Sequence, residues 1–337
     1  MSVVAPRFRF GPFVLRETVH DASAPATLAC DAALYIPSWE ARADAWRAAV
    51  SLTCPRLAYL NFALDGVDGA VLSAQLSRAK ASGAVAIPLR LSVDIEINRK
   101  TLLDRLRAWS AEGADALFID ITSLPKAYIQ SLICSVFTEG LFARLTLGYA
   151  EGRYIQPSDN EAMETAIDFG SANIMSGGVS PCREKHLITV LGGERANCYA
   201  LIEKIAPDSL RVLATRSAAH PEQADGIQTQ VEKLKTVYAD RLAEVREVDA
   251  FSIQSFLEAV DPARLRAETS ATTSIFAAGT KPHAVASAIL ASSISGLDLR
   301  YRRVKAYAPT PVEWAGRYFL YEVIDLRSPA LARCQPW

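Results

Sequence analysis

At two places in the chain, a lysine follows an apolar strand and begins a helix. The first stretch is IDITSLPKAYIQSLI, residues 119 to 133, and the second is IFAAGTKPHAVASAIL, residues 275 to 290. A helix start carries unpaired backbone N–H groups and partial positive charge, which suit a phosphate group. The small and cationic residues of these junctions are Thr122, Ser123, Lys126, Gly279, Thr280 and Lys281. We predict that they bind an anionic ligand.

A structural role explains the same residue types. Ser and Thr cap helices, and Pro is favoured in the first turn of any helix. A lysine in that turn opposes the helix dipole at a cost of roughly a few tenths of a kcal/mol. The lysines therefore point to a ligand more strongly than the caps do.

Polar residues at neighbouring strand ends extend the predicted site. Gly192, Gly193 and Glu194 follow the strand KHLITVL and precede another helix. Asp120 ends an apolar strand, so its carboxylate is expected to accept hydrogen bonds from the N-terminus of its own helix or from a ligand sugar. His283, in the first turn of the second helix, either reaches the same ligand or lies on the surface.

Common cofactor and catalytic patterns are absent from the sequence. GTK lacks the first glycine of a P-loop, and VLGGER is not the G-x-G-x-x-G fingerprint, so no NAD, ATP or other cofactor is predicted. The four histidines have no metal-binding spacing, and no complete catalytic set is found. A binding protein is therefore favoured. The enzyme alternative is a nucleotide phosphodiester or N-glycosidic hydrolase that uses Asp120, Glu194 or His283 as acid or base.

Short apolar strands alternate with helices along most of the chain. The first half reads as the strands DAALYIPS, RLAYLNFAL, AVAIPLRLS, ADALFIDIT and ARLTLGYA, with a helix from Trp39 to about Val50 after the first of them. Parallel strands need helical crossovers, so this alternation predicts βαβ units and a mostly parallel sheet.

The second half repeats this order with the strands KHLITVLGG, SLRVLATRS, EVREVDA and TTSIFAAGT. Landmarks in the two halves lie 154 to 156 residues apart, namely Ser38 with Gly192, Arg56 with Leu210, and Ser123 with Gly279. We interpret the chain as two tandem Rossmann-like α/β domains related by internal duplication.

The predicted organisation has four parts. Residues 1–28 form an N-terminal extension, 29–150 the first Rossmann-like domain, 151–185 a polar linker or cap, and 186–337 the second domain. The last two strands, DLRYRRVKAYA and GRYFLYEVIDL, are expected to form a C-terminal β-hairpin on the second sheet.

Composition sets the broad class. Among 337 residues, 50% are hydrophobic and 22% are charged, with a net charge of −1, so neither direct nucleic-acid binding nor an anionic membrane partner is indicated. No apolar run reaches the roughly 18 residues of a membrane span. The N-terminus does not resemble a signal peptide, and the six dispersed cysteines form no CxxC pair. A cytoplasmic protein with reduced cysteines is expected.

The GTK loop, Gly279 to Lys281, resembles that of the CARF (CRISPR-associated Rossmann fold) domains of prokaryotic antiviral defence. In that group the loop follows a strand and contacts a cyclic oligonucleotide or related nucleotide messenger, often between two such domains. The resemblance implies a sensor for a nucleotide-derived anion, and a duplicated chain would supply both domains. Because no nuclease domain is recognised, a separate effector protein is the expected partner, with a role in antiphage defence. The third alternative is a scaffold that binds protein and no ligand.

Overall fold

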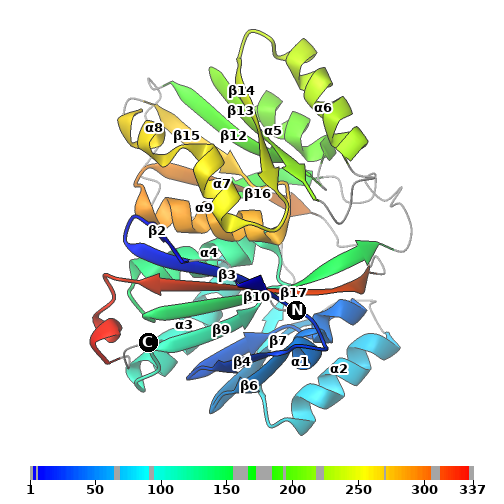
Figure 1. Ribbon diagram of the computed structural model, residues 1–337, viewed down its shortest axis with the longest axis vertical. Coiled ribbons are helices and arrows are strands. Elements are labelled where there is room, and N and C mark those ends of the chain that lie inside the picture. Colours follow the sequence, from blue (N-terminus) through cyan, green and yellow to red (C-terminus); the bar gives the residue numbers. More distant parts are fainter. Residues whose placement is uncertain are drawn as a thin grey trace. The chain divides into compact units, whose positions relative to one another are not determined.

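The computed structural model is a Rossmann-like α/β protein in which helices alternate with strands of two large, mostly parallel sheets (Figure 1). The structure describes residues 3–4, 7–63, 69–90, 95–154, 166–171, 184–192, 195–217, 224–268, 271–304 and 312–333. No helix within these ranges is both long and apolar enough to cross a membrane.

The chain forms two compact units. The first comprises residues 1–125, 135–159 and 307–337, and the second comprises residues 126–134 and 160–306. Helix α4 (Lys126–Thr138) therefore contributes its N-terminal part to the second unit and its last residues to the first.

The first sheet has a core of five parallel strands. They are β5 (Ala32–Tyr35), β7 (Arg56–Ala63), β8 (Val85–Arg90), β9 (Ala116–Asp120) and β10 (Arg144–Tyr154). Their spatial order is β8-β7-β5-β9-β10. Helices α2 (Ala70–Ala81), α3 (Glu96–Ala111) and α4 connect the later strands. After β5, the expected helix is present as the 3-10 turn η1 (Ala41–Asp44) and the short α1 (Trp46–Ala49), and strand β6 begins directly after it at Val50.

The predicted C-terminal hairpin is wrong. Strand β16 (Leu297–Val304) belongs to the second sheet, whereas β17 (Val312–Asp325) pairs antiparallel with β10 of the first. Side-chain fit accounts for the pairing, because the ring of Tyr318 on β17 occupies the space that the absent side chain of Gly148 leaves on β10.

The N-terminal segment is not a separate extension. Strand β3 (Phe13–His20) pairs antiparallel with β17, and β1 (Val3–Val4) and β2 (Phe8–Phe10) pair with β3. Residues that stood outside the predicted repeat thus complete one edge of the first sheet.

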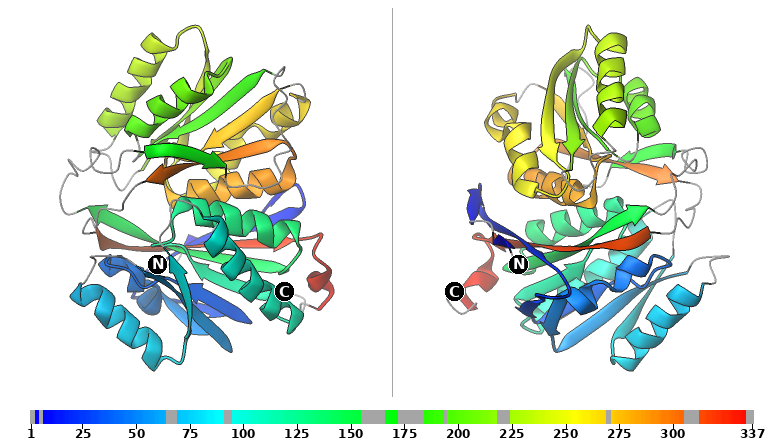
Figure 2. Two further views of the ribbon diagram at one scale, coloured as in Figure 1. Left: turned by 180° about the vertical axis from the view of Figure 1, so that it is seen from behind. Right: turned by 45° about the vertical axis from the view of Figure 1, so that its right-hand side comes forward.

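The second sheet also has five parallel strands. They are β12 (Lys185–Leu191), β13 (Ser209–Arg216), β14 (Leu242–Asp249), β15 (Thr272–Phe276) and β16. Helices α5 (Arg195–Ile205) and α6 (Ala224–Val237) lie on one face, and α7 (Ile253–Val260), α8 (Pro262–Ala267) and α9 (Lys281–Ser293) lie on the other (Figure 2).

Both sheets share one strand order. If the five parallel strands are numbered along the chain, each sheet reads 3-2-1-4-5, with an antiparallel strand beside the fifth. In the second sheet that extra strand is β11 (Ala166–Ser171), which follows β10 in the chain, whereas β17 follows β16 and joins the first sheet. The predicted linker or cap over 151–185 therefore contains the end of β10 and the strand β11, and 155–165 and 172–183 lie outside the described residues.

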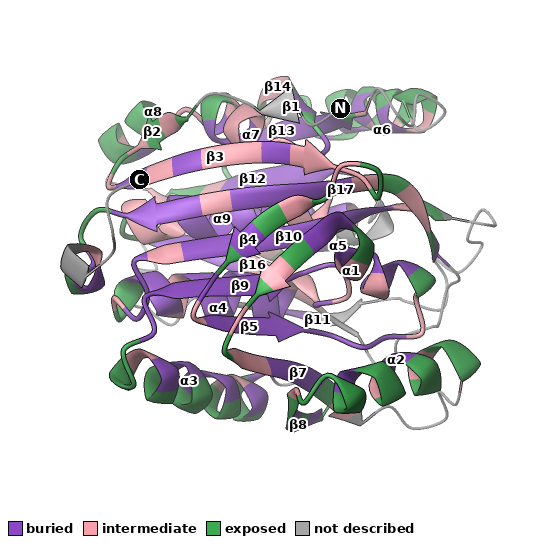
Figure 3. Ribbon diagram, turned by 60° about the horizontal axis from the view of Figure 1, so that its bottom comes forward, coloured by how far each residue is buried: buried purple, intermediate pink, exposed green. Residues whose placement is uncertain are grey.

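The core of each unit lies against its central strands. In the first sheet, β5 and β9 are buried along their whole length (Figure 3). In the second, Leu187 and Leu191 of β12 pack with Val212 of β13 and Phe276 of β15 in one apolar cluster. Close packing in each core fixes the strands relative to one another, and with them the carboxyl ends of the strands.

Candidate functional site

The GTK junction sits where the strand-one and strand-four loops of the second sheet meet. A Cβ atom on Gly192, after β12, would lie 2.8 Å from Cα of Gly279, after β15. A Cβ atom on Gly279 would lie 2.7 Å from Cγ1 of Val190. Real Cβ atoms do not approach so closely, so glycine is needed at both positions for the two loops to touch.

His283 stabilises this junction through buried hydrogen bonds. The side chain is fully buried, Nε2 lies 2.8 Å from the carbonyl oxygen of Asp249, and Nδ1 accepts from the Thr280 backbone N–H at 3.3 Å. Nε2 therefore carries the proton and donates it to Asp249. Burial, helped by the nearby charge of Lys126, lowers the pKa of His283 to about 4. The ring also stacks on Phe256 at 5.7 Å between centroids.

Two predictions about this loop therefore need correction. His283 neither reaches a ligand nor lies on the surface, because both ring nitrogens are used internally. The hydroxyl of Thr280 donates to the carbonyl oxygen of Ala250, so it too binds the loop after β14. Lys281 begins α9 and is half-buried.

Thr215 is a residue that the sequence analysis missed. Near the carboxyl end of β13, it is only 6% exposed, and its hydroxyl has no hydrogen-bond partner among the described residues. Its Oγ1 lies 3.4 Å from the position of a Cβ atom on Gly192, beside the same junction. Buried hydroxyls nearly always have a partner, and an unpaired one indicates a ligand or water. The only sequence signal is a polar residue at the end of the apolar run SLRVLAT.

Helices α4 and α9 pack side by side within the second unit. Nε2 of Gln130 donates to Oγ of Ser287 at 3.0 Å, and Sγ of Cys134 lies 3.8 Å from the carbonyl oxygen of Ala288. The Cys134 thiol also contacts Ser292, about one turn beyond Ser287, just as Cys134 lies one turn beyond Gln130. The contacts therefore advance by about one turn along both helices, so the two helices run parallel. Each follows the fourth parallel strand of its sheet.

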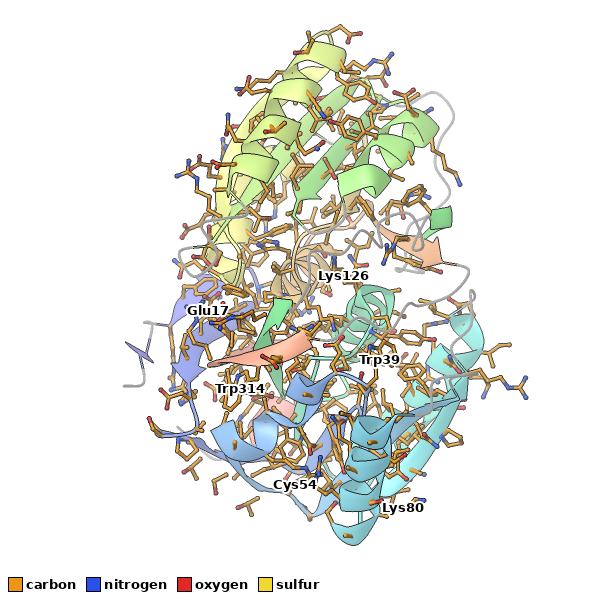
Figure 4. All side chains as sticks on the ribbon, turned by 90° about the vertical axis from the view of Figure 1, so that its right-hand side faces the viewer. Glu17, Trp39, Cys54, Lys80, Lys126 and Trp314 are labelled. Atoms are coloured by element: carbon orange, nitrogen blue, oxygen red, sulfur yellow. The ribbon has the colours of Figure 1, made fainter. Side chains whose placement is uncertain are left out.

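This parallel packing places both helix N-termini at the same end of the pair. Lys126 is the first residue of α4, and Lys281 is the first residue of α9. The charge of Lys126, which Figure 4 labels, acts on His283 in the first turn of α9. The first turns of the two helices therefore lie close together, and each helix begins with a lysine. Two positive helix ends in one region are a favourable environment for an anion.

The strand-four junction of the first sheet is bonded internally. The buried carboxylate of Asp120 accepts from the Thr122 backbone N–H at 3.0 Å, from the Thr122 hydroxyl at 3.2 Å and from the Tyr318 hydroxyl at 2.5 Å. Burial and the neighbouring Asp120 charge raise the pKa of Tyr318 well above its ordinary value. The Thr122 hydroxyl also accepts from the Ala150 backbone N–H at 2.9 Å.

These bonds satisfy Asp120 and Thr122 inside the first unit. Asp120 thus accepts from Thr122, which lies in the turn before its own helix, and from Tyr318 of β17. The expected bonds to the helix N-terminus or to a ligand sugar stay predictions. Ser123 is half-buried, and its hydroxyl oxygen lacks a partner within the described part of the chain.

The strand-one junction of the first sheet is filled by charged side chains. Arg42 is buried, with Nε 2.6 Å from Oε2 of Glu40 and Nη1 donating to the Ala150 carbonyl at 3.1 Å. The amide of Gln75 accepts from Ser38 N–H at 2.9 Å and donates to the Glu40 carbonyl at 3.0 Å. This junction is therefore a self-contained network. Its predicted counterparts in the second half, Gly193 and Glu194, lie outside the described residues.

Comparisons with known proteins leave the ligand open. No family model and no curated protein matches the chain. One similar solved structure is that of a Type III CRISPR defence DNA nuclease activated by cyclic oligoadenylate. The alignment has a TM-score of 0.41 and 9% identity, and it covers 82% of this chain and 65% of that chain. At this level the likeness assigns neither a ligand nor an activity.

Proposed function

We propose that the chain binds a nucleotide-derived anion at the paired N-termini of α4 and α9. The observation that carries this proposal is the parallel packing of the two helices, which brings Lys126 and Lys281 to one end. A lone helix start is a common feature, whereas two lysine-bearing starts at one end form a doubly cationic site.

A contact between two glycines lies beside this site. Gly192 and Gly279 touch through their backbones, with Thr215 beside Gly192. The hydroxyl of Thr215 has no partner among the described residues, and it supplies a donor or acceptor for a ribose or base. We include Thr215 in the ligand site and assign His283 and Thr280 to positioning.

A sensor is favoured over a hydrolase because the described acid–base candidates are occupied. Asp120 has three donors, and both nitrogens of His283 are hydrogen-bonded. The proposal retains internal duplication, supported by the repeated strand order, and a separate effector partner. A role in antiviral defence rests on the resemblance of the GTK loop to CARF domains.

The test is a binding panel of fluorescent cyclic di-, tri-, tetra- and hexanucleotides, measured for wild type and for Lys126→Ala and Lys281→Ala. A charged hydrogen bond contributes about 1.5–3 kcal/mol, so each substitution should weaken binding by about 10- to 150-fold. Lys80→Ala, which removes an exposed lysine of α2, should bind as wild type does.

Three other outcomes would contradict the sensor. If both variants bound with an affinity within about twofold of wild type, the ligand would not bind at this site. Turnover of a bound nucleotide would favour the hydrolase. Failure of every probe, together with a stable protein complex that covers the GTK loop, would favour the scaffold.

A further inference from the structure

Two cysteines that are far apart in the sequence meet beside a small pair of parallel strands. Strand β4 (Ala26–Ala29) pairs with β6 (Val50–Thr53), with Ala29 opposite Thr53. The next residue on each strand is a cysteine, Cys30 and Cys54. The backbone N–H of Cys30 donates to the Thr53 carbonyl at 3.1 Å, so the pairing continues as far as the cysteines.

The two side chains are in direct contact. The thiols of Cys30 and Cys54 are close enough to shift each other's pKa, and both pack in one apolar cluster of the first unit. Opposed residues on neighbouring strands are about 4.8 Å apart. A disulfide spans Cα atoms about 4.4–6.8 Å apart, so this pair has the spacing that the bond requires.

The environment gives the two thiols different roles. The contact with Cys30 lowers the pKa of Cys54, although burial opposes this effect. The Cys54 thiol also donates to the Arg56 carbonyl oxygen at 3.3 Å. The contact between the two thiols, together with burial, raises the pKa of Cys30. Cys54 is half-buried and Cys30 is buried. The thiolate is the reactive form, so Cys54 is the attacking thiol and Cys30 the resolving one.

We propose that Cys30 and Cys54 form a reversible thiol-oxidation site that takes a peroxide as its oxidant and closes to a disulfide. The Cys54 thiolate attacks one oxygen of hydrogen peroxide; the O–O bond breaks, and a proton completes the leaving water. The Cys30 thiol then attacks the Cys54 sulfenic sulfur, and the hydroxyl group leaves as a second water. Two thiols lose two electrons in total, and one peroxide becomes two waters. A dithiol reductant reverses the reaction by exchange.

The bond would close a loop over the strand-one junction of the first unit. Residues 31–53 contain β5, η1 with the buried Arg42, and α1. Oxidation would therefore tie this segment at both ends. Figure 4 labels Cys54, beside the strand pair.

The test is peptide mass spectrometry of the full chain after exposure to hydrogen peroxide and alkylation of the remaining thiols. Trypsin places Cys30 in residues 17–42 and Cys54 in residues 48–56, so the disulfide joins two peptides that are otherwise separate. We expect the joined species to dominate after peroxide treatment and to disappear after dithiothreitol. Cys198, which is fully buried, should stay a thiol throughout.

Variants separate the two steps. Cys30→Ser should leave Cys54 as a sulfenic acid that dimedone captures, whereas Cys54→Ser should leave Cys30 as a free thiol. If Cys30→Ser does not fold, Cys30→Ala serves the same purpose. The joined peptides of the wild-type protein test the proposal in either case. The proposal is overturned if Cys54 is oxidised to a sulfinic acid while Cys30 stays free. It is equally overturned if the joined peptides form only in urea.

Discussion

Acidification should destabilise the second unit through one side chain, His283. In the folded protein this histidine is neutral, because Nδ1 already accepts from the Thr280 N–H and a second ring proton would face that donor. The unfolded chain has no such constraint and takes up a proton near the ordinary pKa. Stability is therefore fully present above pH 6.5 and is lost as the pH falls toward the folded pKa.

The size of the loss follows from the two pKa values. A drop from 6.5 to about 4 corresponds to about 3 kcal/mol in total, of which about 2.5 kcal/mol is lost by pH 4.5. A domain with a typical stability of about 5–15 kcal/mol would show this clearly. His283→Gln keeps an acceptor and a donor but cannot titrate, so it is the matched control.

Urea unfolding at pH 7.5, 6.5, 5.5 and 4.5 measures the effect, read by far-ultraviolet circular dichroism. The tryptophans at positions 39, 46, 109, 314 and 337 all belong to the first unit, so tryptophan fluorescence does not report on the second. Hydrogen exchange of α9 peptides assigns the transition to the second unit. The wild type should lose about 2.5 kcal/mol more than His283→Gln between pH 7.5 and 4.5. If the free energy of unfolding fell equally with pH in both proteins, the proposed role of His283 would be wrong.

Three substitutions test the remaining geometry. Gly279→Ala should cost about 1–3 kcal/mol in urea unfolding, because its Cβ would overlap Val190; an unchanged midpoint would show that the loops do not touch. Tyr318→Phe should cost about 1–3 kcal/mol by leaving Asp120 one donor short, and a neutral result would mean that water replaces the hydroxyl. Thr215→Val should preserve or slightly raise the stability of the ligand-free protein and weaken nucleotide binding in the fluorescence panel; a large loss of stability would reveal an internal partner.

Local sequence patterns were sufficient to predict the parallel strands at the centre of each sheet. Apolar runs ending in small polar residues predicted β9 and β15 and the helices after them, because burial on both faces leaves a strong local signature. The helix expected from Trp39 to about Val50 is present as η1 and α1, but the strand β6 that follows it was not expected, because its pairing with β4 is a long-range contact that helical periodicity does not show.

The place of β17 in the first sheet could not be predicted from local sequence, again because it depends on long-range contacts. Nothing in GRYFLYEVIDL distinguishes a hairpin partner of β16 from a neighbour of β10; the choice depends on the fit of Tyr318 over Gly148 and beside Asp120. The two cysteines likewise gave no local pattern, because the register of β4 and β6 brings them together.

Within the candidate site, the sequence identified positions better than roles. Lys126 and Lys281 do begin helices, as predicted, but no local pattern shows that those helices pack in parallel. His283 was misassigned because burial depends on α7 and the end of β14, which are distant in the chain. Thr215 was missed because a single threonine at a strand end is common.

The most direct test of the central claim is mass spectrometry of small molecules released from the protein after mild purification. Wild type, Lys281→Glu and Lys80→Glu would be purified side by side, the last as a charge-matched control on exposed α2. We expect one nucleotide-derived anion in wild type and in Lys80→Glu, and none in Lys281→Glu. The same nucleotide at the same occupancy in all three proteins would contradict a ligand site at the paired helix N-termini.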